Sequence, residues 1–264
     1  MVRTRPDAAV LRAFGVGAHR PERLAGGRGL TWRAGPVVLR PHDGVVTDWR
    51  SGVLADLTGS PAYRVPRPVA TLDGGWRAGP WEAWEAVAGR VDERRVGEVL
   101  AAGRAFQDAV RHVPRPAFLD VLDDPWSVAD RIAWGERAAP TEPALDRLVA
   151  AFRPVDAPSR LVHGDLLGNV LFADGAAPAV IDWPPYWRPA GVGAAIAVAD
   201  AVCWHDLPVA EALALDTGDV AWRQLLVRAL VFRIATAVLL GGWDAAQAAR
   251  HAPLVRAVTE DGTD

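Results

Sequence analysis

The pattern of apolar and polar positions changes near residue 90. Before that point, short apolar runs alternate with glycine and proline, which is typical of strands joined by turns. After it, apolar residues recur mostly at the spacing of helices. The pattern therefore predicts an α+β protein whose first part is mostly β and whose second part is mostly helical.

Several elements are expected in the first part. Two short apolar runs flank glycine and proline as the strands of a hairpin would, and they follow a cluster of glycines, Gly26, Gly27 and Gly29. Apolar positions at helical spacing predict a helix after the hairpin. Two strand-like runs follow that helix. The expected elements are a short helix at 7–14, a hairpin of 30–34 with 36–40, a helix at 45–57, and strands within 65–72 and 75–87.

The second part predicts a long amphipathic helix at 91–113, which two prolines end, and four shorter or more apolar helices. These lie at 126–137, 143–152, 192–204 and 220–240. The last range contains Arg223, Gln224, Arg228 and Arg233. Polar groups spread through an apolar helix argue against a membrane span, so we expect a buried helix.

Composition narrows the picture in two ways. A net charge of -3 does not require nucleic acid or an anionic membrane as a partner, and the single cysteine, Cys203, excludes an intramolecular disulfide. With no apolar signal segment near Met1, we expect a cytoplasmic protein. All 29 basic residues are arginine and Asn169 is the only asparagine, a composition that a GC-rich coding sequence would give.

The chemistry concentrates in residues 161–183, LVHGDLLGNVLFADGAAPAVIDW. An apolar strand delivers His163 and Asp165 into a short loop that reaches Asn169. A hairpin then follows and returns to Asp182. Two carboxylates that lie close together repel each other, so the arrangement does not favour stability. Together with an amide, however, they suit magnesium, which prefers oxygen ligands. This arrangement is what phosphoryl transfer requires.

HGD, then Asn, then Ile-Asp-Trp resembles the catalytic and metal-binding segments of the aminoglycoside phosphotransferase class of the kinase-like superfamily. With PPYWRP behind HGDLLGNVLF and GGRGLTWRAG upstream, the chain is similar to a small bacterial family within it. The resemblance spans residues 14–240. It implies a bilobal protein-kinase-like fold with a small N-terminal lobe (1–89), a hinge near 84–90, and a larger helical lobe (91–264).

The resemblance also implies roles. Asp165 matches the catalytic aspartate that accepts the proton of the substrate hydroxyl, and Asn169 and Asp182 match the metal ligands. His163 matches a structural support for the loop. The implied partners are ATP or GTP with Mg²⁺, and a small molecule that carries a hydroxyl group.

The resemblance assigns the remaining site residues by position. Gly26, Gly27 and Gly29 match the glycine-rich loop over the phosphates, and Arg40 stands where the family has a lysine. Glu85 and Val87 would hold the adenine edge through their backbone. Tyr186, Trp187 and Arg188 follow the metal aspartate closely, so we expect them to border the acceptor cleft.

Three positions depart from the family pattern. Only three residues separate Asp165 from Asn169, where the family has four, so the loop must be tighter. Arginine at position 40 is planar and longer than lysine. In the helix at 45–57, Gly52 occupies the place of the glutamate that would pair with this cation.

Two hypotheses follow. The first is an ATP- or GTP-dependent phosphotransferase that acts on a small-molecule hydroxyl. The second is a catalytically impaired relative that binds nucleotide or ligand in a regulatory or scaffolding role, which the three departures favour. A third interpretation is a binding module of another fold. The sequence does not indicate the acceptor, the choice between ATP and GTP, or the oligomeric state.

Overall fold

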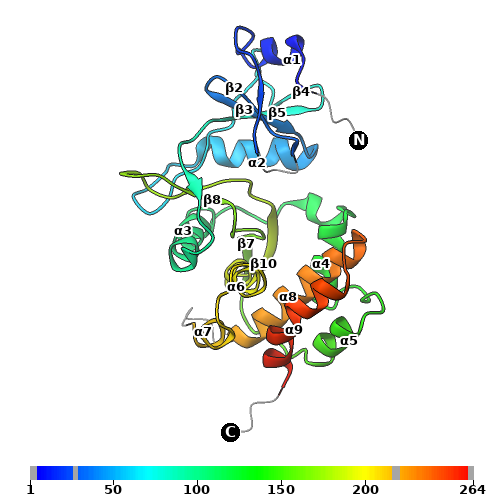
Figure 1. The fold of residues 1–264 in the computed structure, drawn as a ribbon. Coiled ribbons are helices and arrows are strands. Elements are labelled where there is room, and N and C mark those ends of the chain that lie inside the picture. The colour runs from blue at the N-terminus through cyan, green and yellow to red at the C-terminus, as the bar shows by residue number, and fades with distance from the viewer. Residues whose placement is uncertain (1–4, 26–28, 216–220, 261–264) are drawn as a thin grey trace. The chain divides into compact units, whose positions relative to one another are not determined.

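A computed structural model describes residues 5–25, 29–215 and 221–260 (Figure 1). The chain divides into two compact units. Unit 1 comprises residues 1–90 and 172–181, and unit 2 comprises residues 91–171 and 182–264. Unit 1 is built mainly around a β-sheet and unit 2 is mainly helical, so the predicted α+β class is confirmed.

Unit 1 contains a five-stranded antiparallel sheet in the order β1-β2-β3-β5-β4. The expected hairpin is present as β2 and β3, whose turn contains Gly35 at φ +57°, a left-handed conformation that glycine adopts readily. The core of the unit joins helix α1 to the inner face of the sheet. The elements are α1 (Ala8–Ala13), β1 (Glu22–Arg23), β2 (Trp32–Ala34), β3 (Val37–Pro41), α2 (Val45–Asp56), β4 (Arg77–Ala78) and β5 (Trp81–Glu85).

The strand predicted within residues 65–72 was wrong. That segment makes only an isolated bridge between Pro68 and Trp84. Pro66 and Pro68 have no backbone N–H, so the segment cannot form a regular ladder. The apolar range 75–87 instead supplies both β4 and β5, which turn at Gly79 with φ +55°. A separate three-stranded sheet has the order β6-β8-β9, with β6 (Arg90–Val91), β8 (Val170–Phe172) and β9 (Ala179–Val180).

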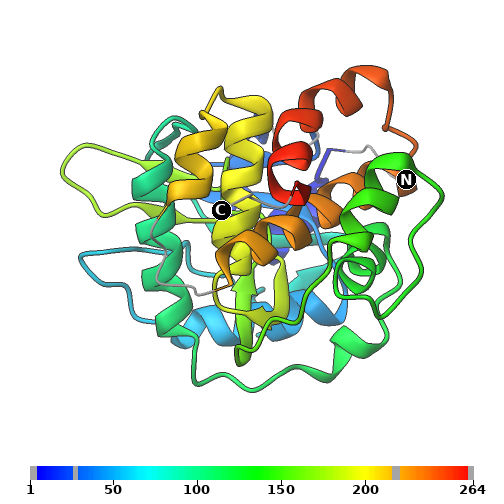
Figure 2. The ribbon, with the colours of Figure 1, turned by 90° about the horizontal axis from the view of Figure 1, so that it is seen from below.

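Unit 2 is organised around α8 (Trp222–Leu239), which packs against several other helices (Figures 1 and 2). Its side chains are buried nearly all round, which explains why the range has an apolar pattern with no clear polar face. The other elements are α3 (Val96–Ala109), the 3₁₀-helix η2 (Ala117–Asp120), α4 (Pro125–Ala133), α5 (Pro143–Ala150), α6 (Val192–Trp204), α7 (Val209–Ala214) and α9 (Ala245–Thr259), with the strand pair β7 (Ser159–His163) and β10 (Pro185–Pro189).

The helices predicted in unit 2 are confirmed, but α7 and α9 were not predicted. Helix α9 contains Pro253, and proline within a helix removes one backbone hydrogen bond. Asp244 compensates at the start by accepting a hydrogen bond from the Gln247 backbone N–H at 2.8 Å. The helix then buries Leu254 and Val255 in the core of unit 2. The cap and this packing therefore help to stabilise a helix that contains a proline.

The long helix predicted at 91–113 begins later, at Val96, because residues 90–91 form β6 and the chain then turns.

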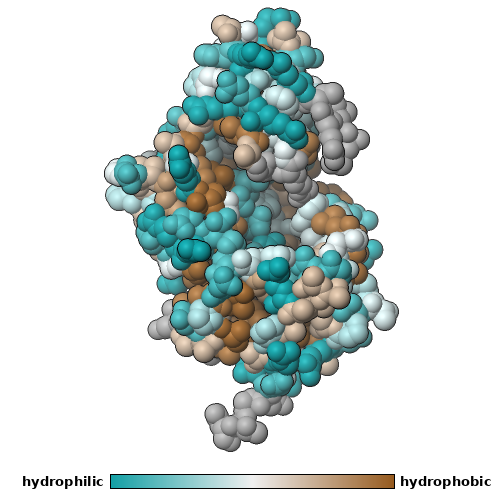
Figure 3. Space-filling model, in the orientation of Figure 1, coloured by the Kyte–Doolittle hydropathy of each residue, from teal (hydrophilic) through white to brown (hydrophobic). Residues whose placement is uncertain are grey.

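None of the helices in the described part of the chain has the length and apolarity that crossing a membrane demands. On the face drawn in Figure 3, hydrophobic residues form separate areas among hydrophilic ones. The most exposed large apolar side chains, Leu72 and Val121, lie in different units.

Helix α6 lies against β7 at Gly193, where a Cβ atom would be 2.7 Å from the His163 carbonyl oxygen. We expect Gly193→Ala to lower the free energy of unfolding by about 1–3 kcal/mol, because helix and strand must separate to admit the methyl group. Gly52 of α2 has open space around its Cα, so Gly52→Ala should instead raise stability by roughly 0.5–1 kcal/mol. Urea denaturation measures both, and equal effects would contradict the packing argument.

Candidate active site

Strand β7 ends at a buried histidine that holds the next part of the chain. His163 is 3% exposed, and its Nδ1 accepts a hydrogen bond from the Asp165 backbone N–H at 3.1 Å. A ring nitrogen that accepts a hydrogen bond carries no proton, so the proton of the neutral imidazole is on Nε2. Phe106 of α3 packs edge-on against the imidazole, with 6.2 Å between the ring centroids. These contacts fix the backbone of Asp165 directly after the strand.

Asn169 closes the loop that follows. Its Nδ2 donates to the backbone carbonyl of Asp165 at 2.7 Å and to Asp165 Oδ2 at 3.1 Å. Gly168 takes φ +86°, which permits the tight turn, and Leu166 and Leu167 are buried beneath it. With only three residues between them, the asparagine amide therefore contacts the aspartate itself.

Arg233 of α8 joins Asp165 to a second carboxylate. Its Nη2 donates to Asp165 Oδ1 at 2.6 Å, and its Nε donates to Asp200 Oδ1 of α6 at 2.8 Å. The Asp165 side chain is 45% exposed, whereas Arg233 is 19% and Asp200 13% exposed. Asp165 is thus held at the edge of a mostly buried ion-pair group and still reaches solvent.

Burial and neighbouring charges shift the pKa values of Asp200 and Arg233 in opposite directions. Burial raises the pKa of Asp200 by more than the Arg233 guanidinium lowers it. For Arg233, burial lowers the pKa, but the two carboxylates outweigh it, so the pKa lies above that of an ordinary arginine. Arg233 therefore stays charged beside Asp165.

Asp182 lies just before a buried tryptophan. Trp183 is 2% exposed, donates from Nε1 to the Val162 carbonyl at 3.1 Å and stacks edge-on with Phe106 at 5.0 Å. Asp182 itself is exposed. Its backbone has φ +50°, a value that residues other than glycine rarely adopt. Such outliers persist where the surroundings enforce them, often at functional sites. The anchored indole fixes the position that follows this outlier.

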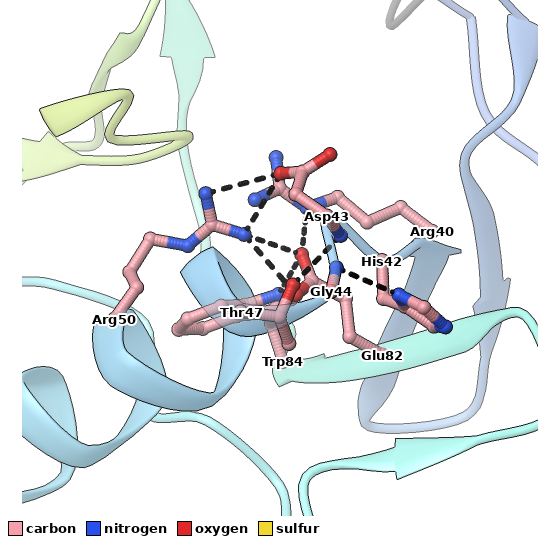
Figure 4. Close-up of polar contacts among 8 residues, drawn as sticks. All are labelled: Arg40, His42, Asp43, Gly44, Thr47, Arg50, Glu82 and Trp84. Carbon is pink, nitrogen blue, oxygen red and sulfur yellow. Dashed lines mark hydrogen bonds and ion pairs between the residues drawn. The ribbon is translucent and has the colours of Figure 1, made fainter. Parts of the chain in front are cut away.

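Unit 1 carries the second group of charges (Figure 4). The carboxylate of Glu82 on β5 accepts a hydrogen bond from Arg40 Nε on β3 and another from Arg50 Nη2 on α2 at 2.8 Å. The Trp84 indole Nε1 donates to the same oxygen at 3.1 Å. Burial opposes the ionisation of Glu82, but Arg40 and Arg50 prevail and lower its pKa. The cation at position 40 therefore has an acidic partner, supplied by a strand.

The predicted nucleotide-binding backbone is described in part. Gly26 and Gly27 lie outside the described residues, and Gly29 follows them with φ +66°. The backbone N–H of Glu85 donates to the Arg67 carbonyl at 2.8 Å. An adenine edge at Glu85 would therefore meet its carbonyl oxygen rather than its N–H.

Comparison with known proteins shows which family the chain belongs to. The sequence model of the phosphotransferase enzyme family matches residues 50–185, just over half of the chain. That range contains the loop from His163 to Asn169 as well as Asp182 and Glu82. The chain belongs to the phosphotransferase enzyme family. No curated protein matches it in sequence.

Solved structures of aminoglycoside phosphotransferases share the fold of this family member. One from Alicyclobacillus acidocaldarius subsp. acidocaldarius DSM 446 is 16% identical, with a TM-score of 0.57, and covers 97% of this chain and 96% of its own. A thermostable mutant of APH(4)-Ia in a ternary complex with ADP and hygromycin B is 17% identical, with a TM-score of 0.58 and coverage of 93% and 95%. Spectinomycin phosphotransferase APH(9)-Ia with ADP and spectinomycin is 13% identical, with a TM-score of 0.56 and coverage of 96% and 98%.

The residues expected at the acceptor cleft of this phosphotransferase family member lie on β10. Arg188 is paired with Asp130 at 2.6 Å and also with Glu136, so its charge is already balanced. Tyr186 packs on Phe232 at 5.6 Å, and burial raises the pKa of its hydroxyl well above the ordinary value. The Trp187 side chain is half-buried.

A cavity of about 370 Å³ opens beside Asp165 in unit 2, and its walls do not include these three β10 residues. Charged groups, ring side chains and an amide line it. They include Asp165, Asp200, Arg233, Trp204, Gln247 and His251. The cavity combines hydrogen-bonding groups with the Trp204 ring, which is 43% exposed.

Sequence reasoning missed three residues of these groups: Asp200, Arg233 and Glu82. In the sequence, Arg233 indicates only that its apolar helix does not span a membrane, and no role is assigned to Asp200. One signal was available for Glu82, because a charge inside the apolar run of β5 must be paired when it is buried. The identity of the partners is not visible in the sequence.

Proposed function

We propose that this chain transfers the terminal phosphate of ATP or GTP to a hydroxyl group of a small molecule. The observation that carries this proposal is the Asp165 carboxylate, which Asn169 and Arg233 hold by its two oxygens while 45% of the side chain stays exposed. A carboxylate held in one orientation at a cavity edge suits a base that receives a hydroxyl proton.

In the reaction, the acceptor hydroxyl donates its proton to Asp165 while its oxygen forms a bond to the terminal phosphorus. The bond from that phosphorus to the bridging oxygen breaks, and the nucleoside diphosphate leaves with the electron pair. Asp165 then releases the proton to solvent. Arg233 keeps the base oriented, because its own anchor is the buried Asp200.

We assign the nucleotide to residues of unit 1, by analogy with solved relatives that hold one. ADP is bound in the solved complexes of APH(4)-Ia and APH(9)-Ia. In this chain we assign the phosphates to Arg40 and the loop of Gly26, Gly27 and Gly29. We assign the adenine edge to the backbone of Glu85 and Val87.

Asn169 and Asp182 fit Mg²⁺ by their chemistry, since an amide oxygen and an exposed carboxylate are the hard oxygen donors that this ion prefers. The two residues would hold the ion, which when bound neutralises charge on the phosphate oxygens. His163 supports the loop that carries Asn169, because its Nδ1 accepts a hydrogen bond from the Asp165 backbone N–H.

The acceptor is assigned to the 370 Å³ cavity beside Asp165. Its volume is within the range of small-molecule sites, and its polar groups suit a hydroxylated compound. The predicted border of Tyr186, Trp187 and Arg188 stays a prediction. Trp187→Ala tests it, because unchanged affinity for a true acceptor would exclude Trp187 from the cleft.

Calorimetry with ATP and magnesium separates the assigned roles. We expect Asp182→Ala to reduce magnesium-dependent ATP affinity at least about tenfold, as loss of a metal ligand does. Asp165→Ala should retain that affinity and lose only transfer to a panel of hydroxyl compounds. Equal loss of binding in the two variants would contradict the roles.

The alternative function is nucleotide or ligand binding without transfer. One observation favours it: Asn169 donates to Asp165 and so occupies one oxygen of the proposed base. Turnover decides between the two functions. Magnesium-dependent binding with no transfer to a broad acceptor panel, unchanged in Asp165→Ala, would establish the alternative.

A further inference from the structure

Glu82 is a buried acid that two arginines share. Its side chain is 1% exposed, and it accepts hydrogen bonds from Arg40 and Arg50, which come from different elements of unit 1 (Figure 4). A buried charge is tolerated only when it is paired and hydrogen-bonded. The Trp84 indole adds a third donor at 3.1 Å, and its ring lies 5.8 Å from the Arg40 and 5.6 Å from the Arg50 guanidinium carbon.

The two arginines differ in how far they reach the surface. Arg50 is 3% exposed and connects α2 to β5 within the unit, whereas Arg40 is 18% exposed. Glu82 contacts Arg40 at Nε, on one edge of a planar guanidinium that carries donors on its other edges as well. Arg40 is therefore held from the buried side and extends toward solvent.

Charge explains why two cations accompany one acid. A single Arg40–Glu82 pair would be neutral and would attract a phosphate weakly. Arg50 adds a second positive charge beside Glu82, which favours an anion near the two guanidinium groups. Asp43 lies 3.4 Å from Arg50, but it is 59% exposed and water screens its charge.

We propose that Glu82 is the positioning residue that orients Arg40 toward the nucleotide phosphates, in place of an acid on α2, and that Arg50 adds positive charge beside it. The inference rests on the proposed function, because it takes a phosphate as the ligand of Arg40. Helix α2 offers Gly52 where such an acid would stand, and its Asp48 pairs with Arg77 at 2.8 Å. In this chain the acid that pairs with Arg40 is therefore on the strand β5.

The test is a double-mutant cycle read by ATP and adenosine affinity. Glu82→Gln should weaken ATP binding at least about tenfold and change adenosine binding little, because only the phosphates contact Arg40. In an Arg40→Met background, Glu82→Gln should have no further effect on ATP affinity. Trp84→Phe, which keeps a ring but removes one donor to Glu82, should give a smaller loss and covers the case in which Glu82→Gln does not fold.

Asp48→Asn is the matched control, because it breaks the exposed Asp48–Arg77 pair of the same unit and should leave ATP affinity unchanged. Normal ATP affinity in Glu82→Gln would overturn the inference. An equal loss with and without Arg40 would also overturn it, since Glu82 would then act only on the fold. The proposed function fails separately, if the cycle behaves as expected but the wild-type protein transfers phosphate to no acceptor.

Discussion

Replacing Asp165 with asparagine is expected to lower kcat of phosphoryl transfer by about 10²–10⁴-fold, the usual contribution of a general base. Asparagine has nearly the same shape and can still face Arg233, but its amide cannot take the proton of the acceptor hydroxyl. The loop should keep its conformation, because the Asp165 backbone N–H is held by the buried His163. Initial rates at saturating ATP measure the effect.

The control for this variant is Asp174→Asn, which changes the same group in the exposed turn between β8 and β9. We expect its rate to match that of the wild type. ATP affinity should be preserved in both variants. A rate for Asp165→Asn within a few-fold of the wild type would show that another group accepts the proton.

Replacing Arg233 with methionine is expected to cost about 3–5 kcal/mol of stability at neutral pH, the loss typical of a buried ion pair that retains one uncompensated charge. The retained charge is Asp200, which is 13% exposed and receives two donors of Arg233. Denaturant unfolding measures the loss. The proposed base should also lose its orientation, so kcat should fall together with stability.

The pH dependence of the Arg233→Met variant has a definite sign. Burial already raises the pKa of Asp200 in the wild-type protein, and the lowering effect of Arg233 disappears in the variant. A carboxyl group whose folded pKa lies above its unfolded value stabilises the fold at low pH and loses that contribution as pH rises through the folded pKa. The penalty should therefore shrink as the pH is lowered from neutral toward the acidic range.

Two further variants make the Arg233 prediction specific. Asp200→Leu combined with Arg233→Met removes both charges and should recover much of the stability, because the unpaired carboxylate is gone. Arg137→Met breaks an exposed pair with Asp123 and should cost less than about 1 kcal/mol. A loss as large in Arg137→Met as in Arg233→Met would show that burial of the pair is not the cause.

Helix prediction succeeded in ranges of twelve or more residues that are rich in apolar side chains. The range 192–204 coincides with α6, and 45–57 with α2 to within one residue. Strand prediction failed at 65–72, where apolar residues alternate with prolines that cannot donate to a ladder. Periodicity reports what a segment can bury, but pairing between strands also depends on donors that proline lacks.

The loop of the candidate site was predictable because its residues are close in the chain. Asp165 and Asn169 are four positions apart, and their contact follows from one tight turn. The ion pairs could not be predicted in this way. Arg40 and Glu82 are 42 positions apart, and Arg233 and Asp165 are 68 apart, so many acids and arginines compete as partners.

By itself, the sequence determined most of the local elements, the change from β to helical structure near residue 90, and the order His163, Asp165, Asn169, Asp182 that led to the phosphotransferase hypothesis. The tertiary structure alone decided which charges meet. It paired Arg40 with a strand glutamate and joined the proposed base to α6 through Arg233. The physical reason is that periodicity encodes burial along one segment, whereas a buried charge is stabilised by whatever partner the packing of distant segments brings to it.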